Sequence, residues 1–141
     1  MAIRTADAGW RGNLAQGSGH MRFGSGAFDG PYNFRTRMAD GKGTNPEELL
    51  GAGHAGGSSM ALALQLTIAG ITVKSIRTTA GVHFEDQVGG WLIHRVDLDT
   101  EAALSETAAA TFEEHPQNAK KNCSISRALS SVDIRLRAKL L

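Results

Sequence analysis

The alternation of apolar and polar residues predicts β-strands at both ends of the chain. The segment Val132–Leu140 alternates without interruption, which is typical of a strand with one buried face. Near the N-terminus, glycines recur between Gly9 and Gly30. Because glycine readily adopts the positive φ of tight turns, this spacing favours short strands joined by turns. We expect these strands at residues 3–12, 18–24 and 32–38.

A long helix is predicted in the middle of the chain. Thr44 and Glu47 have the spacing of a capping box, and Pro46 suits the first turn of a helix. We expect the helix to run to about Ala69, where a glycine follows. Its second half, residues 60–68, is apolar on nearly every side. We therefore expect this helix to be buried in the middle of the fold.

The next part of the chain has the pattern of a β-hairpin. Residues 71–86 and 91–99 are typical of two strands, and Gly89 and Gly90 lie between them. With the strands at the two ends of the chain and the long helix, this order predicts an α+β fold with antiparallel sheets, built as one domain over residues 1–141.

Two shorter helices are predicted before the last strand. Residues 105–122 begin acidic and end basic, which complements the dipole of a helix. Pro116 lies inside this segment and predicts a kink or a break near His115. Ser124 could cap a further short helix over residues 125–130.

Composition and charge narrow the function classes. The chain has 141 residues, of which 41% are hydrophobic, and a formal net charge of +1. This balance gives no electrostatic reason to expect a nucleic-acid or membrane partner. Cys123 is the single cysteine, so neither an intrachain disulfide nor a cysteine metal site can form within one chain. We expect no cofactor and no metal, and the absence of an apolar leader favours a cytoplasmic location.

The first half of the long helix is unusually rich in glycine. Gly51, Gly53, Gly56 and Gly57 lie in its interior, and each costs roughly 1 kcal/mol relative to alanine. One interpretation is that the small residues let another element pack closely against the backbone. The other is that they line a pocket for a ligand. The composition favours close packing without excluding the pocket.

Several motifs of the chain resemble the OsmC/Ohr family of hydroperoxide reductases. The resemblance is carried by Pro31–Arg37, Gly43–Leu50, Ala52–Ala55 and Ser59–Leu62. It covers nearly the whole chain and is greatest to the branch named for osmotically inducible protein C. It implies an intertwined homodimer in which two long central helices lie against curved antiparallel sheets.

The resemblance also implies a thiol peroxidase of the oxidative stress response. In that mechanism a thiolate on the helix attacks a hydroperoxide, and a second cysteine then forms a disulfide with the resulting sulfenic acid. An external dithiol reduces the disulfide. Arg37 and Glu47 match the arginine and the carboxylate of the family motif, and Cys123 matches the second cysteine. The position of the attacking cysteine is Gly57, and Gln16 stands where another family arginine often occurs.

Glycine cannot attack an oxygen atom, so we expect peroxidase turnover to be lost or impaired. Three alternatives follow: a residual peroxidase that uses Cys123 alone or an external thiol, a pocket protein that binds an apolar small molecule without chemistry, and a structural relic. Each candidate residue also has a simpler explanation. Cys123 can be a buried structural thiol, Glu47 a helix-capping residue, Arg37 a solvated charge, and His54 a packed or interface histidine.

Overall fold

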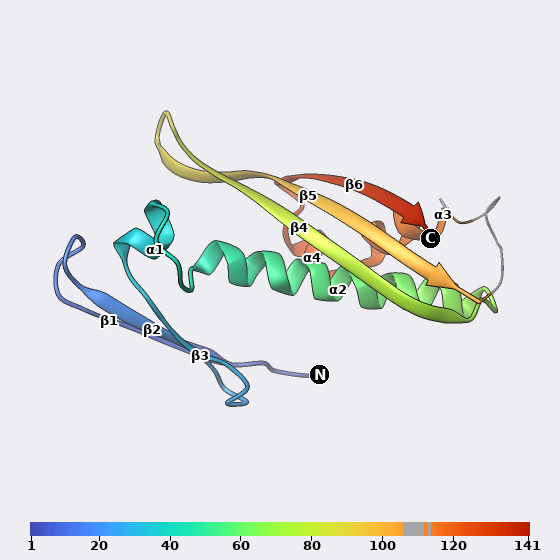
Figure 1. Ribbon diagram of the computed structural model, residues 1–141, viewed down its shortest axis with the longest axis horizontal. Helices are drawn as coiled ribbons and strands as arrows, with labels where there is room; N and C mark the ends of the chain where they lie inside the picture. The colour runs from blue at the N-terminus through green and yellow to red at the C-terminus, as the bar shows by residue number, and fades with distance from the viewer. Residues whose placement is uncertain (106–111, 113) are drawn as a thin grey trace. The chain divides into compact units, whose positions relative to one another are not determined.

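The structure is a computed structural model that describes residues 1–105, 112 and 114–141. The chain divides into two units, residues 1–49 and residues 50–141. Figure 1 labels the helices and strands of both units. The mixture of two sheets with helices confirms the α+β class.

The first unit contains a small antiparallel sheet. Its strands are β1 (Ala6–Arg11), β2 (Ser18–Phe23) and β3 (Asp29–Tyr32), paired in the order β1-β2-β3. All residues of β1 are exposed in the single chain. The first two strands agree with the sequence prediction, whereas the third begins earlier and ends earlier than expected.

Residues 34–38 form a helix and not the strand that their alternation predicts. Helix α1 (Phe34–Met38) follows Asn33, whose side chain accepts a hydrogen bond from the backbone N–H of Thr36 at 3.0 Å. In return, the hydroxyl of Thr36 accepts from the backbone N–H of Asn33 at 3.0 Å. This capping box satisfies two backbone donors locally and overrides the alternation of the side chains.

Helix α2 (Pro46–Ile68) confirms the predicted long helix. Its cap differs from the prediction, because Asn45 and not Thr44 accepts a hydrogen bond at the N-terminus. Oδ1 of Asn45 lies 2.7 Å from the backbone nitrogen of Glu48. After the helix, Gly70 adopts a φ of 77°, which an L side chain rarely tolerates.

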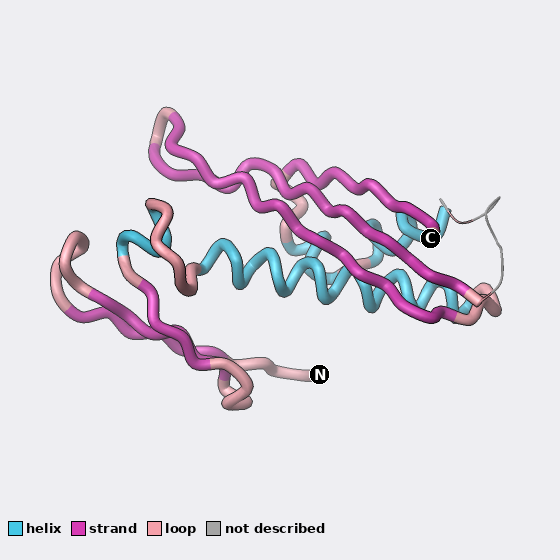
Figure 2. Tube along the Cα trace, viewed as in Figure 1, coloured by secondary structure: helices cyan, strands magenta, loops and turns pink. Residues whose placement is uncertain are grey.

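The second unit contains a larger sheet of mixed direction. Strands β4 (Val73–Gln87) and β5 (Gly90–Leu104) form the expected antiparallel hairpin. Strand β6 (Asp133–Leu140) pairs with β5 in parallel, so the prediction of purely antiparallel sheets is wrong at this point. The reason is the connection: a crossover through helices, and not a tight turn, leads from β5 to β6. Figure 2 shows the three strands side by side.

Two short helices lie within that crossover. They are α3 (Glu114–Asn122) and α4 (Ser124–Ala128). Pro116 is tolerated because it lies in the first turn of α3. Much of the expected helix over 105–122 falls on residues 106–111 and 113, which lie outside the described residues. The predicted cap of the last helix is wrong: Cys123, one residue before Ser124, is the N-cap and makes no side-chain capping bond.

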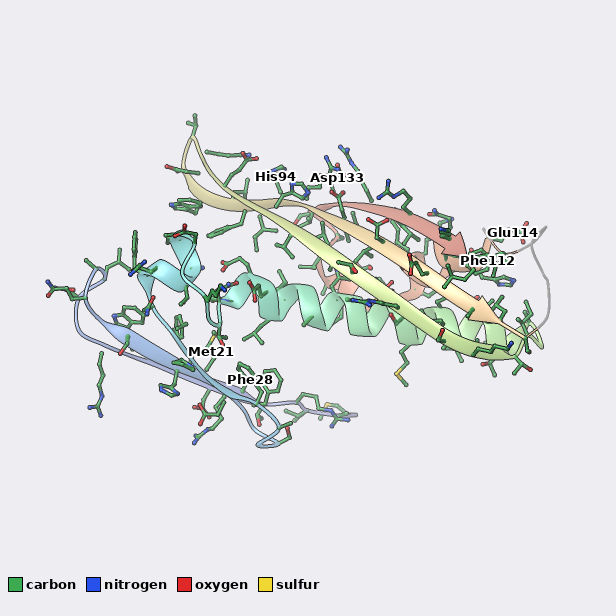
Figure 3. All side chains as sticks on the ribbon, in the orientation of Figure 1. Met21, Phe28, His94, Phe112, Glu114 and Asp133 are labelled. Atoms are coloured by element: carbon green, nitrogen blue, oxygen red, sulfur yellow. The ribbon has the colours of Figure 1, made fainter. Side chains whose placement is uncertain are left out.

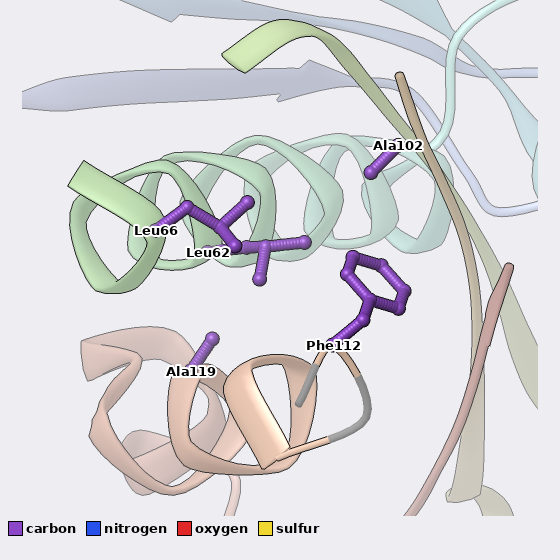
Figure 4. Close-up of a cluster of buried hydrophobic side chains, with 5 residues drawn as sticks. All are labelled: Leu62, Leu66, Ala102, Phe112 and Ala119. Carbon is purple, nitrogen blue, oxygen red and sulfur yellow. The ribbon is translucent and has the colours of Figure 1, made fainter. Parts of the chain in front are cut away.

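The core of the second unit lies between α2, the sheet and α3. Leu62 and Leu66 on α2 pack with Ala102, Phe112 and Ala119, as Figure 4 shows. The opposite face of α2 is apolar but uncovered. Its side chains of Met60, Leu64 and Ile68 are 78%, 57% and 73% exposed. Within the described part of the second unit the helix is therefore buried on one face only, which differs from the expected burial in the middle of the fold, because the sheet covers one side of it.

Opposite charges face each other along the parallel pair of strands. The register places acidic residues of β5 beside basic residues of β6: Asp97 with Arg135, Asp99 with Arg137, and Glu101 with Lys139. Asp133, at the start of β6, lies opposite Arg95 in the register, and Figure 3 shows Asp133 and His94 near the start of that strand. Among these charges, Arg137 of β6 forms an ion pair with Asp99 of β5. Arg95 and Arg135 bond instead to Asp97 and Asp133 of their own strands.

Candidate functional site

Arg37 and Glu47, which the family resemblance singles out, form an ion pair in the first unit. Nη2 of Arg37 lies 3.0 Å from Oε1 of Glu47, and Nε lies 3.2 Å from the same oxygen. The side chain of Glu47 is only 11% exposed, whereas that of Arg37 is 39% exposed. A nearly buried carboxylate therefore orients a guanidinium that still reaches solvent.

The local sequence explains how the two side chains meet. Arg37 lies in α1, the short helix created by the Asn33 capping box, and Glu47 lies in the first turn of α2. Asn45 joins the two helices, because its Nδ2 donates to the backbone carbonyl of Thr36 at 3.2 Å while its Oδ1 caps α2. Glu47 thus acts as an ion-pair partner in addition to being a residue of the first turn.

Arg37 lines a largely apolar surface pocket of about 280 Å³. The other lining residues are mostly aromatic or aliphatic: Trp10, Leu14, Tyr32, Asn33, Phe34 and Met38. Gln16 does not line this pocket. It lies in the turn between β1 and β2, where its backbone nitrogen donates to the side chain of Asn13 at 2.8 Å. An apolar wall with one guanidinium suits an apolar molecule that carries a polar or anionic end.

In the second unit, Cys123 faces Gly57. A Cβ atom added to Gly57 would lie 3.5 Å from Sγ of Cys123 and 3.2 Å from Cγ1 of Ile125. In a disulfide, the Cβ of one residue lies roughly 3 Å from the sulfur of the other, given an S–S bond of about 2 Å. Cys123 itself is only 3% exposed. The chain therefore places its single thiol next to the helix position at which the resemblance puts the missing thiol.

The four helix glycines divide into two pairs. Added Cβ atoms at Gly51 and Gly57 would come within 3.2 Å of Val82 and Ile125 respectively, whereas those at Gly53 and Gly56 would meet nothing within 4 Å. Close packing thus accounts for the first pair. The second pair has no such contact with the described residues of the second unit.

A buried hydrogen bond joins α2 to α4 beside this thiol. Nε2 of His54 lies 2.7 Å from Oγ of Ser126. His54 is fully buried, and burial lowers the pKa of its imidazole from the usual 6.5. Its Nδ1 has no hydrogen-bond partner among the residues that the structure describes. The expectation of a packed histidine is confirmed, but the sequence alone did not indicate its contact with Ser126.

The serines after Gly57 contribute to packing. Ser58 is buried. Ser59 donates a hydrogen bond to Oγ1 of Thr78 at 2.8 Å, and that hydroxyl lies 3.0 Å from Oγ1 of Thr100. These hydroxyls connect α2 to the sheet.

In the described part of the chain, no cluster of three or more His, Cys, Asp or Glu side chains is arranged to hold a metal ion. None of the described helices is long and apolar enough to cross a membrane.

Comparison with known proteins then decides the family. The family model described as OsmC-like protein matches residues 39–137. The chain belongs to the OsmC family. It is 41% identical over 129 residues to the peroxiredoxin OsmC of Escherichia coli (strain K12), covering 91% of this chain and 90% of that protein. The peroxiredoxin OsmC of Shigella flexneri matches with the same identity and coverage.

Solved structures of OsmC and Ohr proteins have the same fold. An organic hydroperoxide resistance protein OsmC from Legionella pneumophila matches with a TM-score of 0.73 and 21% identity, covering 100% of both chains. The organic hydroperoxide resistance protein OhrB of Bacillus subtilis matches with a TM-score of 0.72 and 24% identity, covering 96% of this chain and 98% of that one. Membership of a peroxiredoxin-like redox family agrees with the resemblance seen in the sequence.

Proposed function

We propose that this chain is an OsmC-family protein in which two-cysteine reduction of hydroperoxides is lost or strongly impaired. One observation carries the proposal: the helix position that faces Cys123, where an added Cβ atom would lie 3.5 Å from the sulfur, is a glycine. The chain has no other cysteine. The site therefore has the arrangement for one thiol and lacks its partner.

The chemistry explains why the loss matters. A thiolate attacks the distal oxygen of a hydroperoxide, the O–O bond breaks, and the products are a sulfenic acid and an alcohol. A second thiol then attacks the sulfenic sulfur, forming a disulfide and releasing water. With Cys123 alone, the second step needs an external thiol, and Cys123 is only 3% exposed. Both steps should be slow, because both partners must reach a buried sulfur.

The experiment is a comparison of peroxide consumption with excess dithiothreitol and cumene hydroperoxide. We expect turnover at least ~100-fold below that of the Escherichia coli relative, since loss of a nucleophile typically costs several orders of magnitude. Any residual turnover should disappear in Cys123→Ser. Fast turnover that survives in Cys123→Ser would refute the proposal.

A second candidate function is the binding of an apolar small molecule without chemistry. The pocket of about 280 Å³ beside Arg37 favours it, because six apolar or aromatic and amide residues surround one oriented guanidinium. A ligand that binds only the folded state raises the melting temperature by mass action. Octanoate and 1-octanol serve as probes that differ in the charge of the polar end. If neither probe changes the melting temperature of the natural chain or of Arg37→Met, this candidate function is excluded.

We also propose that the working unit is a homodimer. The exposed stripe of Met60, Leu64 and Ile68 on α2 is too apolar for a face in water, and Gly53 and Gly56 would permit close approach of a second helix. The fully exposed β1 supports the same conclusion. A second copy of the chain is the partner implied by the family resemblance.

A further inference from the structure

We propose that the His54–Ser126 hydrogen bond is a clasp that docks helix α4 on helix α2 and so positions Cys123 opposite residue 57. The inference rests on the proposed function in one respect, namely that Cys123 is the surviving thiol of the family's site. In this proposal His54 and Ser126 are positioning residues: they act through the position of Cys123 and do not contact a peroxide.

The spacing along the two helices supports the clasp. Gly57 lies three residues after His54 on α2, and Cys123 lies three residues before Ser126 at the start of α4. Residues three apart on a helix lie on the same face. Two contacts therefore lie next to each other between α2 and the start of α4. One joins His54 to Ser126 at 2.7 Å, and the other would join a Cβ atom of residue 57 to Cys123 at 3.5 Å.

The burial of the clasp explains why it should matter. His54 is 0% exposed and Ser126 is 7% exposed, so water cannot replace either partner. Nδ1 of His54 makes no hydrogen bond with the described residues. Ser126 thus supplies the polar contact that compensates for burying the imidazole. Loss of its hydroxyl would leave neither ring nitrogen with a partner among the residues that the structure describes.

The short length of α4 makes a clasp necessary. The helix has only five residues, and its N-cap, Cys123, makes no side-chain capping bond. A helix of this length is marginal by itself. Contacts with its neighbours α3 and α2 therefore hold it in place. On the α2 side, His54 supplies a buried polar contact. Opening of the clasp should expose Cys123.

The first test measures how fast Cys123 reacts with iodoacetamide in the natural, folded chain. Reaction of a buried thiol requires local opening, so the rate reports the stability of the α2–α4 contact. We expect Ser126→Ala to raise the rate roughly tenfold, since a lost buried hydrogen bond shifts a local equilibrium by about that factor. Ser126→Thr, which keeps the hydroxyl, should restore a rate close to that of the natural chain.

A matched control separates the clasp from general destabilisation. Thr100→Val also removes a buried hydroxyl with a hydrogen bond in the same unit, but on the sheet. It should lower the melting temperature without accelerating alkylation of Cys123. An unchanged rate in Ser126→Ala, or an equal acceleration in Thr100→Val, would overturn the clasp.

The second test uses the equilibrium of an introduced disulfide. In Gly57→Cys, the disulfide between residues 57 and 123 is titrated against glutathione, which measures its reduction potential. Adding Ser126→Ala should make this bond several-fold easier to reduce, because the two sulfurs are no longer held together. An equilibrium that does not change would also contradict the clasp. Neither test measures peroxide turnover, so the proposed function and the clasp can fail separately.

Discussion

Ile125 on α4 closes over Gly57 on α2, with its Cγ1 atom 3.2 Å from where a Cβ atom of residue 57 would lie. This distance is tight but involves a side chain that can move. A side chain at residue 57 therefore needs a small movement of Ile125. The same added Cβ atom would lie in ordinary van der Waals contact with Sγ of Cys123, at 3.5 Å.

Gly57→Cys should therefore regain peroxide reactivity and form a disulfide with Cys123. Cysteine is also a better helix former than glycine, by a few tenths of a kcal/mol. Mass spectrometry after one equivalent of cumene hydroperoxide should find the 57–123 disulfide. The double variant Gly57→Cys with Ile125→Val should form more of this disulfide, because the shorter side chain at residue 125 leaves more room for the new Cβ atom.

The matched control for this experiment is Gly56→Cys. A Cβ atom at residue 56 would meet none of the described residues within 4 Å, Cys123 included, so a thiol there does not face Cys123. It should give no intrachain disulfide with residue 123. If both thiols of Gly57→Cys stay free under conditions that oxidise the Escherichia coli relative, restoration has failed.

The buried His54 predicts a pH dependence of stability. Burial lowers the pKa of His54 below 6.5, so the unfolded chain takes up this proton before the folded chain does. Stability is therefore fully present above the unfolded pKa of about 6.5 and decreases as the pH falls below it, towards the folded pKa. The melting temperatures of the natural chain and of His54→Gln should change with pH in the same way above pH 6.5. Below pH 6.5, that of the natural chain should fall more steeply.

A second group loses its contribution in a separate, more acidic range. Hydrogen bonds from Arg95 and His83 lower the pKa of Asp97 from 3.8 to about 2, so the contribution of Asp97 to stability is lost only as the pH falls through that interval.

An identical pH profile of the melting temperature for His54→Gln and the natural chain between about pH 5 and pH 6.5 would show that His54 does not titrate as proposed.

The exposed face of α2 predicts self-association. Leu64→Glu should weaken the dimer, because it places a charge in the middle of the apolar stripe. Sedimentation equilibrium should report twice the chain mass for the natural protein and a smaller average mass for the variant. Gln117→Glu, on the exposed surface of α3, is the control and should leave the mass unchanged. A natural chain that is a folded monomer at micromolar concentration would exclude the dimer.

The charge pattern of β5 and β6 predicts the result of a charge exchange. Asp99 and Arg137 pair in register, with Nε of Arg137 at 2.8 Å from Oδ1 of Asp99. Asp99→Arg should lower the melting temperature, because two guanidinium groups then face each other. Adding Arg137→Asp should recover part of the loss. If the double variant is no more stable than Asp99→Arg, the pair does not contribute to the pairing of these strands.

The sequence predicted the elements whose signals are local and strong. Helix α2 has proline at its start and glycine after its end, and the β4–β5 hairpin has two glycines at its turn. Residues 34–38 were misassigned, because the capping box of Asn33 and Thr36 outweighs their alternation. The direction of β6 could not be predicted, since alternation shows which side chains share a face and carries no information about the neighbouring strand.

The candidate site divides in the same way. Arg37, Glu47 and Cys123 were found through their match to family motifs, and the first two do form an ion pair. The contact between His54 and Ser126 was missed, because the two residues are 72 positions apart and no local pattern links them. Only the packing of α4 on α2 brings them together.

The parallel pairing of β5 and β6 also has a consequence for folding. The β4–β5 hairpin joins neighbouring residues across a tight turn and can form early, whereas Asp99 and Arg137 are 38 positions apart. Strand β6 can add to the sheet only after the crossover that carries α3 and α4 has closed. Until then the edge of β5 is open to wrong partners. The ion pair between Asp99 and Arg137 can form only when β6 takes its place beside β5, so it favours the correct partner at this late step as well as the finished fold.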